Sequence, residues 1–572
     1  MSHRSHLTSV RFASGLRDAL KGERYSWRAL RSDALAGLTV AVVAIPLAMA
    51  LAIAAGAPPQ YGLYSAIVAG LVASLTGGSR FSVSGPTAAF VVILAPITSR
   101  YGMAGLATAG LMAGLILLGL GAAKLGRLIE YVPEPVTVGF TSGIAFVIAL
   151  LQLRDLFGLG VTDLPESTLA KAGALAGALP SATWSAVVVS AVTLLVIAAW
   201  PQKRLIIAGY APAIAIGAVV AFALARAGSP VDTIGSRFTV EAAGAVIHGI
   251  PRTLPHFTLP WALPGAPTGP FVLSLETVRD LLPAAISIAV LGAIESLLCA
   301  VVLDHSTGTR HHSNGELLGQ GLANIVAPFF GGVPSTAALA RSAANATAGA
   351  RTPVAAAFHS VFVVAGVLLL APALAFVPMA SMAAVLVVVA WKMSDAPAAL
   401  LLLRRASRAD KLVLVTCVLL TVAFDMVIAI TAGIVLAAFL FMRDIARFTQ
   451  VRDVTGTPRY SGGHVPDGWR IVKVTGAMFF AAAERVLSQL LEETPDGSGL
   501  VVYADGVTLL DAGGISALER FAEECAARGI RVLIADLQPQ PARAAHAAGI
   551  GSETSALELT PTLDAALAIV RK

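Results

Sequence analysis

The chain has 572 residues, of which 56% are apolar and only 13% are Asp, Glu, Lys or Arg, about half the ~25% charged content of a typical soluble protein. Together with a mean hydropathy of +0.79, this composition excludes a soluble globular enzyme, a disordered chain and a disulfide scaffold. It predicts a polytopic α-helical membrane protein with room for about a dozen spans and one small soluble domain.

The net charge of +6 is divided unevenly along the chain. Residues 1–450 carry 29 Lys/Arg and 19 Asp/Glu, whereas residues 451–572 carry 11 and 15, so the net charges are +10 and −4. The basic excess lies in the membrane part, where it is typical of cytoplasmic loops. We therefore expect no nucleic-acid partner. Cys299, Cys417 and Cys525 are too far apart to indicate a disulfide framework or a metal site.

The membrane part contains fourteen apolar segments. A full helix needs ~20 residues to cross the hydrocarbon core, so the short third and tenth segments, which follow Gly- and Pro-rich sequence, are expected as half-helices. The segments are 34–55, 60–77, 84–99, 102–122, 136–153, 183–200, 206–226, 281–303, 316–330, 335–350, 353–374, 378–391, 410–424 and 426–442.

The distribution of basic residues predicts the orientation in the membrane. Seven Lys/Arg lie in residues 1–31, so the N-terminus is expected in the cytoplasm, and an even number of spans places the C-terminus there too. With this topology the predicted cytoplasmic segments up to residue 450 hold 21 Lys/Arg and the outer segments hold seven. The 3:1 bias supports the topology.

The fourteen segments form two sets of seven around a connection, 227–280, that carries seven prolines and is expected outside. An odd number of spans in each half inverts one half relative to the other. Segment 3 opens with Gly85–Ala89 (GPTAA) and segment 10 with Pro334–Ala338 (PSTAA), each after a Gly-Gly pair. Small residues are common in packed membrane helices, so the similarity alone is compatible with chance. Its position in corresponding segments favours an inverted repeat.

After residue 450 the pattern changes to strands that alternate with helices, which predicts a small cytoplasmic α/β domain. Strands are expected at 469–476, 499–504 and 530–536, and helices at 481–493, 513–528, 540–548 and 562–571. The predicted organisation is an N-terminal cytoplasmic segment 1–33, a first repeat 34–226, a periplasmic connection 227–280, a second repeat 281–442, a linker 443–457 and an α/β domain 458–572.

The openings of the two half-helices are the predicted substrate site. A helix that begins inside the membrane exposes unpaired N–H groups and a positive dipole end, and two such ends that face each other can hold an anion near the midplane. The alternative is that these small residues only permit kinks and close packing. The predicted substrate-binding residues are Ser84, Gly85, Pro86, Thr87, Ala88, Ser335, Thr336, Ala337 and Ala338.

Arg341 is the one basic residue placed within a span rather than at its edge. It follows Pro334 by ~10 Å, or two helical turns. A charge inside the membrane is costly and usually faces a cavity or a partner. We expect Arg341 to bind a substrate carboxylate or sulfate. An ion pair with a protein acid and snorkelling from a short helix are the alternatives.

Glu295 is the matching acid, ~21 Å into segment 8. A lone acid inside the membrane can load and release a proton, so we expect Glu295 to couple transport to a proton. Binding of Na⁺ and a salt bridge to Arg341 are the alternatives. Apart from this coupling ion, no cofactor and no metal site is expected.

The histidines receive less specific interpretations. His305, His311 and His312 lie in a polar loop and are expected to be solvated rather than metal ligands. His359, in segment 11, is expected to be packed and hydrogen-bonded, with membership of a proton relay as the alternative. No Walker loop, H-E-x-x-H or G-x-S-x-G motif is present, so neither ATP-driven pumping nor hydrolysis is expected, and we predict that the protein is not an enzyme.

Several blocks of the sequence resemble the SulP family of anion transporters, the sulfate permease and prestin group. The blocks are Ala44–Ala50, Gly56–Ser65, Gly77–Ala89, Leu291–Ser296, and Asn314–Gly321 with Asn324. The tail resembles the STAS domain that ends these transporters, so the similarity covers about residues 30–572. The sequences of Leu291–Asp304 and Ala340–Asn345 are most similar to those of a bacterial C4-dicarboxylic acid transporter of this family.

The resemblance implies a fourteen-segment transport domain split into core and gate subdomains. Segments 3 and 10 would cross in the core, with the substrate between their N-termini. Glu295 matches the acidic position used for proton or cation coupling in bacterial members, and Arg341 matches the segment 10 arginine of prestin-like members. The family is typically homodimeric and moves its core like an elevator. A multi-pass protein of the bacterial inner (plasma) membrane, surrounded by membrane lipid, is therefore expected.

The sequence departs from the family pattern at two places. The family's first helix often reads Pro-Gln, with the Gln facing the substrate, whereas Leu47 follows Pro46 here. This weakens the transfer of inorganic-sulfate specificity. The STAS loop that can carry a phosphorylatable Ser reads Asp511-Ala512-Gly513-Gly514, which makes a phospho-switch doubtful. The domain is then expected to dock a cytoplasmic protein partner or to aid dimerisation.

These observations predict a secondary active anion transporter, a proton symporter of C4-dicarboxylates such as fumarate, succinate or aspartate, that works by elevator-type alternating access. A bicarbonate or sulfate transporter coupled to Na⁺ or H⁺ is the competing substrate hypothesis. A membrane anion sensor that signals through the STAS domain is the hypothesis from a different class, and a channel or voltage-driven motor is a third.

Overall fold

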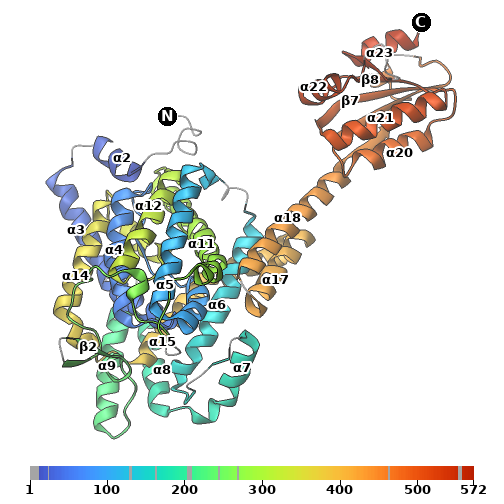
Figure 1. Cartoon of the computed structure of the whole chain (residues 1–572). Coiled ribbons are helices and arrows are strands. Elements are labelled where there is room, and N and C mark those ends of the chain that lie inside the picture. The colour runs from blue at the N-terminus through green and yellow to red at the C-terminus, as the bar shows by residue number, and fades with distance from the viewer. Residues whose placement is uncertain are drawn as a thin grey trace. The chain divides into compact units, whose positions relative to one another are not determined.

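The computed structural model describes residues 12–22, 25–127, 132–161, 164–165, 167–201, 209–242, 245–266, 269–424, 426–461, 464–551 and 557–572. It divides into two compact units, Met1–Ile434 and Val435–Lys572. Figure 1 shows a helical unit and a unit built on a sheet.

Helices or half-helices occupy all fourteen predicted spans, with residues 206–208 of the seventh span lying outside the described residues. One long helix, α5, contains the helical part of span 3 and all of span 4, because two helices merge across a kink at Gly102. Among the described residues, seven helices are long and apolar enough to cross a membrane. The helices are α3 (Trp27–Ala54), α4 (Pro59–Thr76), α5 (Val91–Ala122), α6 (Glu134–Phe157), α8 (Trp184–Ala199), α9 (Tyr210–Arg226), α11 (Leu275–Thr307), α12 (Ser313–Val326), α13 (Leu339–Thr347), α14 (Val354–Leu374), α15 (Met379–Met393), α17 (Arg408–Ala423) and α18 (Met426–Phe448).

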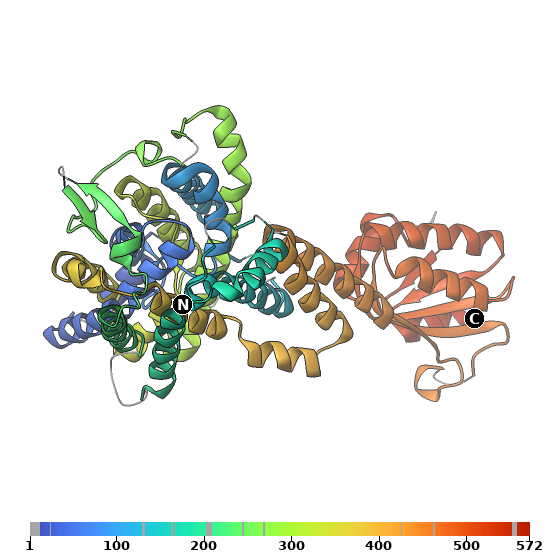
Figure 2. The same cartoon turned by 90° about the horizontal axis from the view of Figure 1, so that it is seen from below.

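Several short elements of the first unit have no counterpart in the sequence-based assignment. The long connection contains a two-stranded hairpin, which Figure 2 shows at the edge of the helical unit. Short elements are too weakly periodic to stand out in a hydropathy pattern. They are α2 (Ser14–Gly22), α7 (Thr168–Gly177), α10 (Ile234–Arg237), β2 (Thr239–Ala242), β3 (Ala245–His248) and α16 (Ala396–Arg405).

The helix contacts of the first unit repeat when the two halves are exchanged. Helix α3 packs on α14 as α11 packs on α5, and α4 packs on α14 as α12 packs on α5. In the same way α6 packs on α17 and α8 packs on α15. Each of these pairs joins one span from each half. The pairing is the contact pattern of an inverted seven-plus-seven repeat, in which neither half can bury its apolar faces without the other.

The second unit contains a five-stranded sheet in the order β5–β6–β7–β8–β9, with β5 antiparallel and the others parallel. The three expected strands and four expected helices are present. The short β5 and β9 were not expected, and residues 443–457, expected as a linker, include the end of α18 and β5. The elements are β5 (Gln450–Asp453), α19 (Pro458–Ser461), β6 (Trp469–Met478), α20 (Ala483–Glu493), β7 (Gly499–Leu510), α21 (Ala512–Ala527), β8 (Arg531–Ala535), α22 (Pro539–Ala547), β9 (Leu557–Thr560) and α23 (Leu563–Val570).

The two faces of this sheet bury alternate residues of the same strands. Val502 and its neighbours of one face pack under α20, α21 and α22, whereas Val501 and its neighbours of the other face pack under α23. Figure 1 shows α20 and α21 side by side over the sheet. This is the two-sided burial of a parallel sheet. It explains why the strands read as continuous apolar runs.

Helix α21 begins at the loop that lacks the phosphorylatable Ser. The Asp511 side chain accepts a hydrogen bond from the Gly514 N–H at 2.8 Å and thereby caps the helix. An acidic N-cap also complements the positive end of the helix dipole. Asp511 therefore stabilises the N-terminus of α21.

We predict that Asp511→Ala loosens the first turn of α21 by about 1 kcal/mol, the usual cost of a lost N-cap. Hydrogen exchange of the first-turn amides in the full-length protein should accelerate about fivefold, which is the equivalent of that free energy at 25 °C. Asp467→Ala is the matched control, because Asp467 is exposed. Equal exchange in both variants would contradict the capping role.

Candidate substrate and coupling site

Two extended segments pair inside the helical unit where the sequence predicts the half-helix openings. Strand β1 (Ser84–Gly85) is antiparallel to β4 (Thr336–Ala337), with Ser84 opposite Ala337. The Ala338 N–H donates to the Val83 carbonyl at 3.0 Å, which extends the pairing. The helices that follow begin at Val91 and Leu339, later than the sequence suggests, because the backbone is extended before each helix.

Several backbone donors expected at the anion site are already engaged. The Ser335 N–H donates to Asn324 Oδ1 at 2.8 Å, and the Ala337 N–H donates to Ser296 Oγ at 3.3 Å. Neither α5 nor α13 has a side-chain cap at its N-cap residue, Phe90 or Ala338. The unpaired N–H groups predicted for Ser335–Ala338 are therefore found instead in the first turn of α13, because this helix has no side-chain cap.

Glu295 reaches the crossing from α11. Its Oε2 accepts a hydrogen bond from Thr87 Oγ1 at 2.9 Å, so an acid of segment 8 contacts a residue of segment 3. The Glu295 side chain is partly exposed, whereas Thr87 is 7% exposed. The Glu295 carboxylate is therefore connected to the predicted substrate site through Thr87.

Arg341 is fully buried beside the same strands. Its Nη2 donates to the Pro86 carbonyl, while Nε and Nη1 have no hydrogen-bond partner among the described residues. A Cβ on Gly85 would lie 2.4 Å from Arg341 Nη1, so the guanidinium occupies the space that the missing side chain leaves. Burying N–H groups of a cation without hydrogen-bond partners costs free energy. A bound anion would supply the missing partners and so recover this free energy.

The two charged residues occupy different places at the crossing. Among the ion pairs of the described residues none joins Glu295 to Arg341, so the salt bridge considered from the sequence is not formed in this structure. Glu295 contacts Thr87 and Arg341 contacts Pro86. One acid and one base thus bind neighbouring residues of the same segment 3 opening.

Sequence reasoning missed three polar side chains that hold the crossing. Ser296 Oγ lies 2.5 Å from Thr336 Oγ1, Gln320 Nε2 donates to Ser84 Oγ at 2.7 Å, and Asn324 Nδ2 donates to the Ser335 carbonyl at 2.8 Å. Gln320 and Asn324 are spaced by four residues, and so are Gln320 and Glu316. This polar spacing along an otherwise apolar segment was the available signal.

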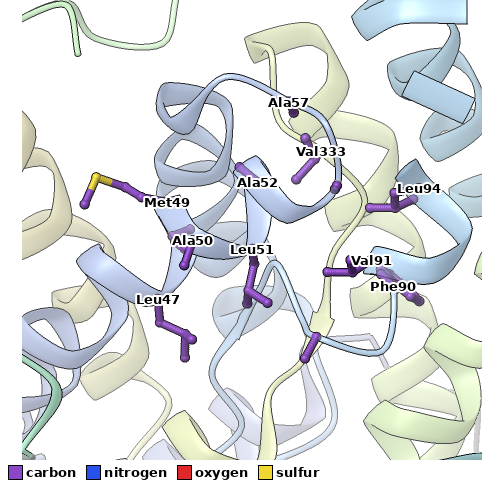
Figure 3. Packing of buried hydrophobic residues seen from close by; sticks show 14 of the residues in the cluster. Leu47, Met49, Ala50, Leu51, Ala52, Ala57, Phe90, Val91, Leu94 and Val333 are labelled. Atoms are coloured by element: carbon purple, nitrogen blue, oxygen red, sulfur yellow. The ribbon is translucent and has the colours of Figure 1, made fainter. Parts of the chain in front are cut away.

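An apolar surface flanks the crossing. Leu47 is 5% exposed and belongs to the same buried cluster as Leu51, Phe90 and Val91. Figure 3 shows these residues on α3 and at the start of α5, around the extended segments. The residue that follows Pro46 is therefore a packed leucine.

The histidines agree with expectation in part, since His305 is exposed as expected. His312 is 2% exposed and its Nε2 lies 2.8 Å from Asp18 Oδ2, and His311 Nδ1 lies 2.8 Å from Asp304 Oδ2. The prediction that these two are solvated is wrong, because the loop folds back onto acidic neighbours. His359 is buried, but neither ring nitrogen has a hydrogen-bond partner among the described residues, so the expected hydrogen bond is not formed there.

Comparison with known proteins identifies the family. The sulfate permease family model matches residues 30–418 and the STAS domain model matches residues 464–566. A putative sulfate transporter of Bacillus subtilis, YvdB, is 35% identical over 527 residues, which cover 92% of this chain and 95% of the relative. The chain belongs to the sulfate permease (SulP) family.

Other relatives and solved structures agree with this assignment. The bicarbonate transporter BicA of Picosynechococcus is 29% identical over 72% of this chain and 70% of its own. The structure of SLC26A9 superposes with a TM-score of 0.80 over 98% of this chain and 93% of that chain, at 19% identity. The fold is thus that of the SLC26 anion transporters, with a fourteen-segment inverted repeat and a C-terminal STAS domain. This SulP protein is a multi-pass membrane anion transporter and not an enzyme.

We predict that Gly85→Ala disturbs the Arg341 contact with Pro86, because the added methyl group would overlap the guanidinium. Overpacking of this kind costs about 1–3 kcal/mol. The variant should unfold at a lower temperature and take up anions more slowly in proteoliposomes.

Gly119→Ala is the control, because a Cβ at this position, in helix α5, would meet no described atom within 4 Å. It should be neutral or slightly more stable, since Ala is the better helix former. Equal thermal stability and uptake of the two variants would show that Gly85 provides no essential space.

Proposed function

We propose that this SulP protein is a proton-coupled symporter of C4-dicarboxylates such as fumarate, succinate or aspartate. The observation that carries the proposal is the hydrogen bond from Thr87 to Glu295. It connects a partly exposed acid to the opening of segment 3, where the anion is expected. Protonation of Glu295 and occupation of the site would then affect each other through Thr87.

The energetics of anion uptake favour a proton as the coupling ion. Moving one elementary charge across a potential of 100 mV costs about 2.3 kcal/mol, so a dianion alone would be opposed by about 4.6 kcal/mol at a negative-inside membrane. Two accompanying protons remove that cost. Glu295 can carry one of these protons. Arg341, whose Nε and Nη1 have no partner among the described residues, provides a fixed positive charge for the anion at the same crossing.

The substrate class is supported by the combination of donors and apolar surface. Segments 3 and 10 offer the hydroxyls of Ser84 and Ser335, and α3 offers the packed Leu47 in place of a polar side chain. A dicarboxylate carries two anionic ends and an apolar middle, which suits such a lining better than a compact inorganic anion does. Movement of the core subdomain, which contains segments 3 and 10, against the gate subdomain, in a homodimer, is the proposed mechanism.

A second candidate is Na⁺- or H⁺-coupled uptake of bicarbonate or sulfate. It is favoured by the relatives, which include a bicarbonate transporter and putative sulfate transporters. In this case Glu295 would contribute to a cation site, and the anion would be held by the first turn of α13 and by Arg341.

Uptake by the purified protein in proteoliposomes separates the two candidates. We expect labelled fumarate to accumulate when the external pH is lower than the internal pH, and unlabelled succinate to compete with it. Sulfate or bicarbonate uptake without fumarate uptake would reject the dicarboxylate proposal in favour of the second candidate. Binding without flux would instead point to an anion sensor.

We predict that Glu295→Gln abolishes accumulation driven by the pH gradient but leaves exchange of internal for external substrate. The amide keeps the size and can still accept from Thr87, but it cannot bind the coupling proton. Glu276→Gln, an exposed position of the same helix, is the control and should accumulate substrate normally. Undiminished accumulation by Glu295→Gln would remove Glu295 from the coupling role.

A further inference from the structure

Helix α12 presents three buried polar side chains one turn apart. Glu316, Gln320 and Asn324 are each at most 2% exposed and lie on one face, because residues four apart are neighbours along a helix. They contact, in order, the loop after α4, strand β1 and the residue before strand β4. Helix α12 therefore makes hydrogen bonds to both extended segments.

The first contact fixes which way the hydrogens point. Glu316 Oε2 accepts from the Gly78 N–H at 2.9 Å and the Ser79 N–H at 3.0 Å, and its Oε1 accepts from Gln320 Nε2 at 3.0 Å. A carboxylate accepts but does not donate. Gln320 must therefore turn its NH₂ group toward Glu316, and the reversed amide would place two oxygens against each other.

The second contact, between Gln320 and Ser84, has its hydrogen-bond direction set by the orientation of the Gln320 amide. The same Gln320 Nε2 lies 2.7 Å from Ser84 Oγ, and an NH₂ group donates but does not accept. Ser84 Oγ must therefore be the acceptor in this bond. Its own O–H hydrogen meets no further acceptor among the described residues and remains free to donate.

The third contact, between Asn324 and Ser335, also leaves a serine hydroxyl without a partner among the described residues. Asn324 binds both the N–H and the carbonyl of Ser335 at 2.8 Å, while Ser335 Oγ is buried without a partner among the described residues. The backbone of Ser335 is thus occupied and its hydroxyl is not. Helix α12 thus leaves the Ser84 hydroxyl on β1 and the Ser335 hydroxyl just before β4 as the groups available to an anion.

We propose that Gln320 is a positioning residue that forces the Ser84 hydroxyl to act as a hydrogen-bond donor to the transported anion, with Glu316 fixing the orientation of Gln320. The inference rests on the proposed function, because it takes Ser84 as a substrate ligand. Gln320 itself does not touch the substrate and acts through Ser84.

Replacing Gln320 by Glu reverses the direction of the bond. The oxygen at the former Nε2 position holds at most one hydrogen, which the neighbouring Glu316 carboxylate takes. Ser84 then faces a lone pair and must donate to it. Gln320→Leu removes the partner without reversing it, so the hydroxyl loses its orientation but not its ability to donate.

The test measures KM and the maximal rate of labelled-anion uptake by full-length variants in proteoliposomes, with fumarate and sulfate as the two probes. A lost hydrogen bond to a charged group corresponds to roughly a tenfold change in affinity or more. We expect KM to rise about tenfold in Ser84→Ala and in Gln320→Glu, and about threefold or less in Gln320→Leu. Thermal unfolding of each purified variant confirms that it is folded.

The double variant separates positioning from simple charge repulsion. If Gln320 acts through Ser84, Gln320→Glu adds no further rise in KM to Ser84→Ala, which is the non-additivity of coupled residues. A further rise in the double variant, or equal effects of Leu and Glu at position 320, would overturn the proposal. If Gln320→Glu does not fold, the same cycle with Gln320→Leu is decisive, since an effect that persists without the Ser84 hydroxyl contradicts positioning.

The outcomes also distinguish this inference from the proposed function. Wild-type protein that takes up neither probe rejects the transport proposal. Wild-type uptake with an unchanged KM in Ser84→Ala removes Ser84 as a ligand, and this inference with it, while leaving transport intact.

Discussion

The pairing of β1 with β4 is the interaction on which the transport unit depends. Inside a membrane no water satisfies an extended backbone, so its N–H and carbonyl groups must find partners in the protein. Here each lead-in segment is the partner of the other. A half-helix can begin near the middle of the unit because of this pairing, and Glu295, Arg341 and the serines are brought together as a result.

The pairing in turn requires close approach of the surrounding helices. A Cβ on Gly78 would lie 2.2 Å from the His312 carbonyl oxygen, and one on Gly319 would lie 2.4 Å from the Gly77 Cα. The Gly-Gly loop after α4 therefore packs directly on the backbone of α12. This contact lets the Glu316 carboxylate reach two N–H groups of the loop, and it sets the depth at which Gln320 and Asn324 meet the strands.

Much of this arrangement could be predicted from the sequence. Hydropathy located the long spans because each is a sustained apolar run, the Gly- and Pro-rich lead-ins marked the two half-helices, and the low charge content singled out Glu295 and Arg341. The extended form of Ser84–Gly85 could not be predicted, because two-residue strands carry no periodicity and their pairing joins residues far apart in the chain. The orientations were equally inaccessible: which donors are occupied depends on Gln320, Asn324 and Ser296, whose partners are set by tertiary packing rather than by spacing.

The long separation between the two strands has a consequence for biogenesis. Arg341 binds the carbonyl of Pro86, which lies 255 residues earlier in the chain. Strands β1 and β4 are separated by nearly the same number of residues, so β1 is synthesised well before its partner. At a synthesis rate of ~5–20 residues per second, this interval is about 13–50 s. During that time the backbone groups of β1 lack the partner that they have in the folded protein. We therefore expect final burial of segment 3 to follow synthesis of the second half.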